Sequence, residues 1–287
     1  MMSHSKWQEV DPGIWIADSG YPGTSVAIMT DVHGDEGTSR LVKDHLMQNP
    51  PPIEEGSLTL ISANPEASAQ NKHYIGSNMN RGFSRNPVTA TKPPEAERLE
   101  VVLPHLERVD ALLDIHDTSS PCDPFIICER NSLDTALRIG RRQSMTGLAI
   151  AFGFSEMEPG GSDDFMYKQG KEGLCFESGD MSNPKANLPI AIETATRFLI
   201  VNGLVEGEVP LPCIEPLMIE VYRRIMSTED FKWAELFNNF QILKQGQLLA
   251  TSNGIPEYAS EGDVILFPAR KIVPGDEACE IARVVNS

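Results

Sequence analysis

Short apolar runs alternate with amphipathic stretches over most of the chain. The runs have the length of strands and occupy residues 25–29, 57–62, 111–118, 125–128, 147–154 and 173–179, after an opening strand or hairpin at 7–16. Helical spacing of apolar residues marks 40–48, 95–109, 132–144 and 184–201. Strands that alternate with helices, several of them apolar on both faces, predict an α/β fold with a mixed, mainly parallel central sheet flanked by helices.

The pattern changes near residue 209. Beyond it helical spacing fades, and short strands separated by glycine turns dominate, with residues 264–268 as the clearest strand. The chain is therefore predicted to divide into a larger domain, residues 1–208, and a small β-rich C-terminal domain, residues 209–287.

One long stretch, residues 66–94, is polar, rich in Asn, Gly and Pro, and has little periodicity. A loop of this length inside a compact domain is usually functional or disordered. Its His, Tyr, Asn, Arg and Phe residues favour a functional loop. Residues 160–164 are expected to form a turn or lid.

Composition limits the classes of partner. The net charge is −17, from 24 Lys and Arg against 41 Asp and Glu, whereas nucleic acids and anionic membranes require a basic surface. No apolar run approaches the ~20 residues that cross a bilayer, and the N-terminus lacks the apolar core of a signal peptide. A cytoplasmic protein with no nucleic-acid or membrane partner is predicted, and a homo-oligomer stays open.

The five cysteines show no Cys-x-x-Cys pairing, so we expect reduced thiols rather than a disulfide framework. Cys175 lies two residues before Glu177 and is a candidate nucleophile. Buried packing is the alternative role for it.

Polar groups able to hold a metal follow several of the predicted strands. His33 and Glu36 stand three residues apart in the turn after the strand at 25–29, and His116 lies at the end of another strand. In an open α/β sheet such strand ends converge on one crevice. Two His and one Glu form a three-ligand zinc set that leaves one position open.

A second carboxylate outside such a set is needed to move protons during hydrolysis. Glu177, at the end of the strand at 173–179, is placed for that role. Asp114 points to the same side of its strand as His116 and could orient that ligand, or simply form a salt bridge at the strand end.

Four motifs follow one another along the chain: His33-Gly34-Asp35-Glu36, the loop from Asn64-Pro65 to Asn80-Arg81-Gly82-Phe83, Asp114-Ile115-His116-Asp117-Thr118, and Phe176-Glu177-Ser178-Gly179. In this order they resemble the succinylglutamate desuccinylase/aspartoacylase family, a branch of the zinc carboxypeptidase fold. The resemblance implies that one zinc is held by His33, Glu36 and His116. It further implies that Glu177 is the general acid/base, and that Asn80 and Arg81 bind the carboxylate of a small N-acyl amino acid substrate.

One position departs from the family's pattern. The arginine that usually polarises the scissile carbonyl is replaced here by His73, followed by the expected aromatic residue, Tyr74. His73 could donate one hydrogen bond to the developing oxyanion, with less permanent charge than Arg. Lys72 is the alternative donor.

Three functions remain open from the sequence. The leading hypothesis is a zinc-dependent hydrolase, in residues 1–208, that cleaves the amide bond of an N-acyl amino acid. A metallocarboxypeptidase acting on peptide C-termini would use the same zinc and base. A catalytically silent ligand-binding relative is the third. The acyl group and the amino acid are not specified by the sequence.

Overall fold

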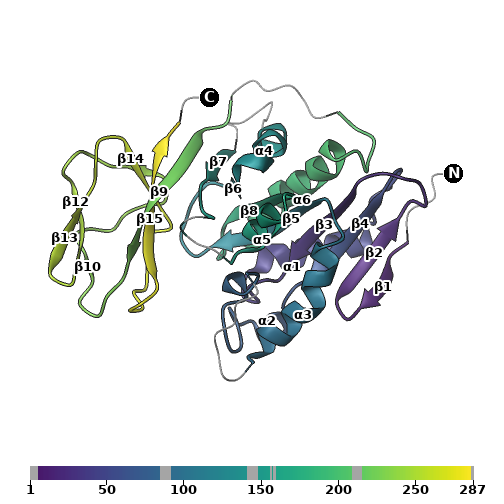
Figure 1. Cartoon of the computed structure of the whole chain (residues 1–287), viewed down its shortest axis with the longest axis horizontal. Coiled ribbons are helices and arrows are strands. Elements are labelled where there is room, and N and C mark those ends of the chain that lie inside the picture. Colours follow the sequence, from purple (N-terminus) through teal and green to yellow (C-terminus); the bar gives the residue numbers. More distant parts are fainter. Residues whose placement is uncertain are drawn as a thin grey trace.

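The fold is seen in a computed structural model that describes residues 6–84, 92–140, 148–155, 157, 160–208 and 215–285. A long twisted sheet runs through the molecule, with helices against its N-terminal half and strands alone in its C-terminal part (Figure 1). The predicted α/β class with a β-rich C-terminal part is confirmed. The proposed division at residue 208 falls beside residues 209–214, outside the described ranges, and stays a prediction.

Twelve strands pair in the order β1-β2-β4-β3-β5-β8-β6-β7-β9-β15-β14-β11. The central pairs β4/β3, β3/β5 and β5/β8 are parallel, whereas β6 runs antiparallel to β8. The strands of this sheet are β1 Gln8–Asp11, β2 Ile14–Asp18, β3 Ser25–Thr30, β4 Ser57–Ser62, β5 Ala111–Thr118, β6 Phe125–Cys128, β7 Ala149–Phe152, β8 Glu172–Asp180, β9 Met218–Met226, β11 Gln241–Ile242, β14 Asp263–Leu266 and β15 Glu277–Val284.

A separate three-stranded sheet lies in the C-terminal part, in the order β10-β12-β13. It packs with β9, β14 and β15 around a small core that includes Phe231, Phe237 and Ile281. Its strands are β10 Lys232–Trp233, β12 Leu248–Ser252 and β13 Ile255–Tyr258.

Six α-helices and two short 3-10 helices are present in the described residues. They are α1 Gly37–Gln48, α2 Pro65–Gln70, α3 Pro94–Leu106, α4 Leu133–Gly140, α5 Ser162–Lys168 and α6 Pro184–Val201, with η1 Met79–Arg81 and η2 Arg130–Ser132. None of these helices is both long and apolar enough to cross a membrane.

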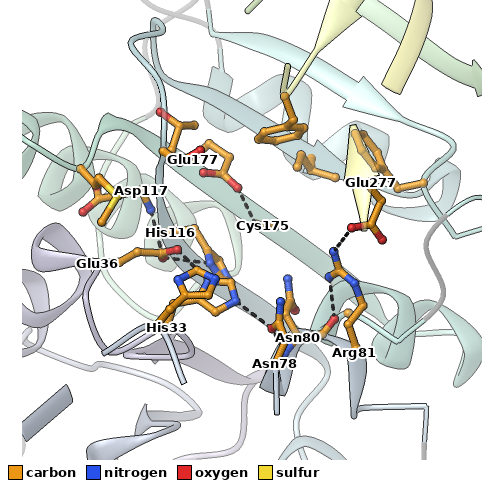
Figure 2. A pocket seen from close by; sticks show the side chains of 18 of the residues that line it. His33, Glu36, Asn78, Asn80, Arg81, His116, Asp117, Cys175, Glu177 and Glu277 are labelled. Atoms are coloured by element: carbon orange, nitrogen blue, oxygen red, sulfur yellow. Dashed lines mark hydrogen bonds and ion pairs between the residues drawn. The ribbon is translucent and has the colours of Figure 1, made fainter. Parts of the chain in front are cut away.

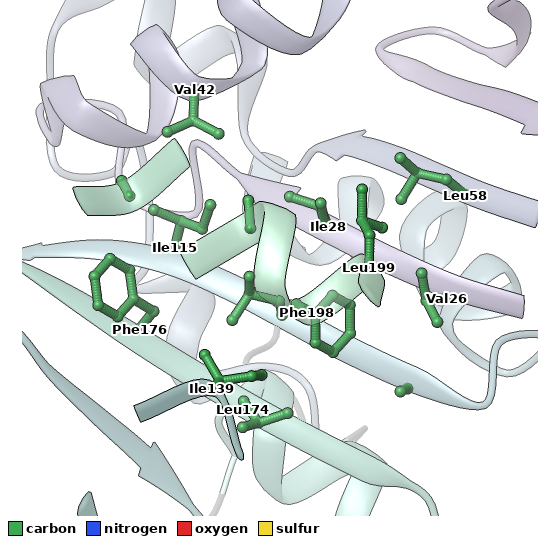
Figure 3. Close-up of a cluster of buried hydrophobic side chains, with 14 of the residues drawn as sticks. Val26, Ile28, Val42, Leu58, Ile115, Ile139, Leu174, Phe176, Phe198 and Leu199 are labelled. Atoms are coloured by element: carbon green, nitrogen blue, oxygen red, sulfur yellow. The ribbon is translucent and has the colours of Figure 1, made fainter. Parts of the chain in front are cut away.

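Strand alternation gives the sheet two cores, one on each face. Side chains such as Ile28, Ile115 and Phe176 point to the face covered by α1, α4 and α6, where Phe198 of α6 is fully buried (Figure 3). The intervening residues, among them Met29, point to the face covered by α3 and α5. Because β5 and β8 alternate in the same way, His116 and Glu177 lie on the α3/α5 face.

Two local expectations were wrong. Residues 66–94 are not loop throughout, because Asn64 caps a helix by accepting a hydrogen bond from the Ala67 N–H, with Pro65 at its first position. Residues 160–164 are not only a turn, since α5 begins at Ser162. The last residues of the helix predicted at 132–144 lie outside the described ranges.

Candidate active site

The turn between β3 and α1 is held in place by the buried carboxylate of Asp31. Asp31 adopts the left-handed backbone conformation (φ 59°), and its side chain, fully buried, pairs with Lys43 Nζ at 2.6 Å. Ser62 and Ser68 donate hydroxyl hydrogen bonds to the same carboxylate at 2.7 and 2.9 Å. The turn that follows is thereby fixed to β4, α1 and α2.

Glycine is required inside this turn. A Cβ on Gly34 would lie 2.1 Å from the carbonyl carbon of Ala67, so any side chain there would collide with the backbone of α2. The close approach of turn and helix brings the side chains of His33 and Glu36 to the carboxyl end of the parallel strands, where His116 lies two residues before the end of β5.

His33, Glu36 and His116 form a compact set of ligand atoms. Each offers one atom, and these atoms lie within 4.8 Å of one another. His33 Nδ1 lies 2.6 Å from Glu36 Oε1, and His116 Nδ1 lies 3.0 Å from Glu36 Oε2. All three side chains are buried (Figure 2).

The Nε2 atoms of His33 and His116 lie on the side of each ring away from Glu36, and each faces an oxygen atom. Asn78 Oδ1 lies 3.0 Å from His33 Nε2 and also accepts the backbone N–H of Asn80 at 2.9 Å, which identifies this atom as the amide oxygen. His116 Nε2 lies 3.0 Å from Asp114 Oδ2, an ion-pair contact whose angle is poor for a hydrogen bond. Protons are therefore favoured on both Nε2 atoms.

With protons on Nε2, the Nδ1 atoms of His33 and His116 carry lone pairs, and these lone pairs face the ionised carboxylate of Glu36. Two imidazole lone pairs against a carboxylate repel one another unless a cation or additional protons lie between them. The side chains of this chain thus fit a divalent cation, with Nδ1 ligation and oriented outer nitrogens, as is usual for metal-binding histidines.

The electrostatics of the three groups agree with this arrangement. Burial lowers the pKa of His33. Burial opposes ionisation of Glu36 as well, but the two histidines hold its pKa far below the usual range. For His116, burial lowers the pKa, but the carboxylates of Asp114 and Glu36 outweigh it and raise the pKa well above normal. Glu36 is therefore held ionised between the two imidazoles, and a positive charge is favoured on His116 and disfavoured on His33.

Glu177 stands beside this set without belonging to it. It is the register partner of His116 across the parallel pair β5/β8. The side chain is 7% exposed, and Oε2 has no hydrogen-bond partner among the described residues. Burial raises the pKa of Glu177 to about 8, with the positive charge of His116 opposing it and Glu36 adding to it. A carboxylate in such a place can take up and release a proton near neutral pH.

The loop that carries Asn80 and Arg81 is held by a buried acid that the sequence did not reveal. The carboxylate of Glu95, on α3, accepts backbone N–H bonds from Ile75, Gly76 and Ser77 at 2.6, 3.1 and 3.0 Å. This places η1 in the cavity wall. Arg81 reaches away from the histidines to Glu277 Oε2 of β15, 3.4 Å distant (Figure 2).

His73 lies directly over His33. The two rings stack at 3.8 Å between centroids with 14° between their planes, and His73 Nδ1 is 2.9 Å from Asp35 Oδ1. Lys72, in contrast, extends to Gln70 at the exposed surface. Of the two alternative donors, only His73 contributes to the cavity.

All seven residues singled out in the sequence line one cavity of about 720 Å³, a size suited to a small molecule. They are His33, Glu36, His73, Asn80, Arg81, His116 and Glu177. Sequence reasoning gave no role to Asn78, Asp163, Glu277 and Glu280, which line it too. Cys175 is in the wall, but burial raises the pKa of its thiol well above normal, which disfavours a nucleophilic thiolate.

Known proteins resemble this chain over most of its length. It is 21% identical over 276 residues to the N-acyl-aromatic-L-amino acid amidohydrolase (carboxylate-forming) of Rattus norvegicus, covering 86% of this chain and 85% of that protein. It is 28% identical over 239 residues to the N-alpha-acetyl-L-2,4-diaminobutyric acid deacetylase of Halomonas elongata, covering 74% of this chain and 67% of that protein.

The fold matches solved structures as well. A succinylglutamate desuccinylase from Vibrio parahaemolyticus superposes with a TM-score of 0.77 and 17% identity, over 96% of this chain and 86% of that one. Residues 22–199 match the model of the succinylglutamate desuccinylase/aspartoacylase catalytic domain. That range includes the turn with His33 and Glu36, the loop with Asn80 and Arg81, and Glu177. The chain belongs to the succinylglutamate desuccinylase/aspartoacylase family.

Proposed function

We propose that the protein is a zinc-dependent amidohydrolase that removes the acyl group from an N-acyl amino acid. The observation that carries the proposal is the pair of histidine Nδ1 atoms converging on Glu36, beside Glu177, whose Oε2 has no hydrogen-bond partner in the part of the chain that the structure describes. Family membership and the two relatives, one acting on N-acyl aromatic amino acids and one on an acetylated diamino acid, support the reaction class.

His33, Glu36 and His116 would hold one zinc ion per chain. A zinc ion in a set of two His and one Glu supplies Lewis acidity, which makes a water more acidic and a carbonyl more electrophilic. Asn78 and Asp114 would keep the two imidazoles in the orientation and tautomer that ligation requires.

Glu177 would act as the general base and then as the general acid. Its carboxylate takes a proton from the attacking water and delivers that proton to the leaving amide nitrogen. Burial raises the pKa of this group above its ordinary value, so that it can hold the proton between the two transfers. His73 would donate a hydrogen bond toward the oxygen that gains negative charge.

Asn80 and Arg81 would bind the substrate carboxylate. The planar guanidinium of Arg81 can offer two parallel N–H donors to a carboxylate, which fixes orientation as well as position. The amide of Asn80 lies in the same wall and can complete the clamp.

Metal content and one substitution test the proposal together. Purified protein should contain zinc, or take it up at neutral pH, in about one equivalent, and it should hydrolyse members of a panel of N-acetyl, N-succinyl and N-formyl amino acids. Glu177→Gln should lower kcat by ~10²–10⁴-fold, the usual range for a general base, while the zinc content stays unchanged. A protein that neither holds nor takes up zinc would contradict both hydrolase hypotheses.

The same panel separates the alternatives. Dipeptides with free C-termini would be preferred by a metallocarboxypeptidase, whereas N-acyl amino acids would be preferred by a deacylase. A zinc-loaded protein that binds these compounds but hydrolyses none of them would be a silent ligand-binding relative.

A further inference from the structure

The wall of the cavity beyond the metal ligands is strongly acidic. Among the described lining residues, only Arg81 and Lys271 carry an ammonium or guanidinium group. Arg81 is engaged with Glu277, and Lys271 is exposed to solvent, where its charge is screened. The carboxylates of the wall, apart from Glu36 and Glu177, are Asp35, Asp117, Asp163, Asp164, Asp276, Glu277 and Glu280.

Neighbours within the protein satisfy the best buried of these acids. Asp164 accepts from Lys168 Nζ at 2.6 Å and from the Gly160 N–H at 2.9 Å. Glu280 lies 3.3 Å from Arg224 Nε. Each of these two carboxylates has a cationic side-chain partner within the protein.

Asp163 is different. Among the residues that the structure describes, no side chain donates a hydrogen bond to its carboxylate or forms an ion pair with it. Its acceptor oxygens receive only the backbone N–H of Asp164. Burial raises the pKa of Asp163 to about 7, and the charges of Glu129, Asp114 and Asp164 add to the shift. A cation in the cavity would relieve this unfavourable environment and restore the carboxylate.

The position of Asp163 fits the far end of a substrate side chain. Its backbone packs on Gly173, where a Cβ would lie 2.8 Å from Asp163 Cα. Gly173, Cys175 and Glu177 follow one another on the same face of β8. At ~3.3 Å per residue along the strand, Asp163, which packs on Gly173, lies on the order of 10 Å from Glu177.

Asp163 is also close to the proposed carboxylate clamp. A Cβ built on Gly161 would lie 2.6 Å from Asp163 Oδ1 and 3.6 Å from Asn80 Oδ1. A substrate whose carboxylate met Asn80 and Arg81 could therefore extend its side chain past this point to Asp163. A second carboxylate in the cavity, Glu177, is only 7% exposed, and its Oε2 has no hydrogen-bond partner among the described residues.

We infer that Asp163 is a specificity-determining residue that binds a cationic nitrogen at the end of the substrate's side chain. The substrate class is then the N-acyl derivatives of basic amino acids. This inference rests on the proposed function, since the scissile amide must lie between the metal ligands and Glu177 while the side chain lies along β8.

The test compares matched substrates and matched variants. With the acyl group that the enzyme hydrolyses fastest, kcat/KM is measured for derivatives of 2,4-diaminobutyrate, ornithine and lysine, for the neutral norvaline and norleucine analogues, and for glutamate. The wild type should prefer the best basic substrate over its neutral analogue by about tenfold or more, because the half-buried carboxylate of Asp163 has no side-chain partner among the described residues and gains one only from a ligand that carries a positive charge.

Asp163→Asn should lower that preference by about tenfold, and Asp163→Lys should shift it toward the glutamate derivative. Asp134→Asn is the matched control, because Asp134 is an exposed residue in the first turn of α4, outside the cavity. It should leave the preference unchanged. Thermal unfolding of each variant verifies that it is folded.

A wild type that prefers neutral or acidic substrates, or a preference unaltered in Asp163→Asn, would overturn the inference and leave the proposed function intact. Hydrolysis of no N-acyl amino acid by zinc-loaded protein would instead remove the proposed function. In that case calorimetric binding of the free basic amino acids to wild type and to Asp163→Asn still decides whether Asp163 binds a cation: equal or absent binding overturns it.

Discussion

Asn78 Oδ1 joins His33 to Asn80. The oxygen lies 3.0 Å from His33 Nε2 and accepts the Asn80 N–H at 2.9 Å. One side chain thus orients a proposed metal ligand and begins the short helix that carries the proposed carboxylate clamp. The proposed metal site and the proposed substrate site are therefore linked through this amide.

Asn78→Ala should therefore weaken zinc binding by ~10–100-fold, the usual effect of removing the hydrogen-bond partner of a ligating histidine. Without Oδ1, His33 is free to rotate and to place its proton on either nitrogen. The affinity is measured by competition with a chromophoric chelator. Asn49→Ala, at the C-terminal end of α1 and outside the cavity, should leave it unaltered; equal affinities in the two variants would contradict the role of Asn78.

The pair Arg81–Glu277 leads to a second prediction. Glu277 lies on β15, 196 residues away in sequence, and holds a guanidinium that we propose for substrate binding. Glu277→Gln should raise KM by about three- to tenfold with little change in kcat, because Arg81 loses the contact that sets its direction before substrate arrives.

Steady-state kinetics on the best substrate of the panel measure this separation. Glu257→Gln is the control, since Glu257 pairs with Arg223 at 3.3 Å outside the cavity. A fall in kcat with unchanged KM in Glu277→Gln would show that Glu277 acts on the chemical step instead.

The convergence of His33, Glu36, His116 and Glu177 on one cavity could be predicted because strand ends meet. His33 and Glu36 are neighbours in one turn, and His116 and Glu177 are register partners on adjacent parallel strands. Each lies where an apolar run stops. The carboxyl ends of neighbouring parallel strands meet at one edge of an α/β sheet, so residues at these positions come close together.

The rest of the cavity carries no such signal. Glu277 reaches Arg81 from a strand that pairs with β9 and β14 in the C-terminal part, and nothing local in the sequence marks that contact. Asp163 looks like an ordinary acid in the first turn of a helix. The absence of a side-chain partner for it among the described residues depends on the tertiary packing of α5 on Gly173. The cap of α2 was a missed signal, because Asn64-Pro65 is a standard helix start.

Glu280 predicts how stability depends on pH. It is 2% exposed, and burial raises its pKa to about 7, although Arg224 opposes the shift. The folded state therefore holds a proton that the unfolded chain, with a pKa near 4.5, has already released. Stability from this group is complete below about pH 4.5 and is lost as the pH rises toward 7.

The Tm of the wild type should accordingly fall between pH 5 and pH 8, and Glu280→Gln should reduce the slope. Asp163 and Glu177, whose pKa values are raised to about 7 and about 8, contribute with the same sign and leave a residual slope. Glu220→Gln is the control. Glu220, on β9, is partly exposed and pairs with Arg130, so its removal should leave the slope unchanged. Parallel curves for wild type and Glu280→Gln would contradict the assignment.

The buried pair Asp31–Lys43 supports the ligand turn and can be tested with a double-mutant cycle. Asp31→Asn keeps a residue that tolerates the positive φ but leaves the Lys43 ammonium, 17% exposed, without its 2.6 Å carboxylate partner. Breaking a buried pair from one side costs ~3–5 kcal/mol, mostly because one charge is left uncompensated. Urea unfolding of Asp31→Asn should show a loss of this order in the free energy of unfolding.

Adding Lys43→Met removes the uncompensated ammonium charge, so the double variant should be more stable than Asp31→Asn alone. Strict additivity of the two single losses would show that Asp31 acts through Ser62 and Ser68 rather than through Lys43.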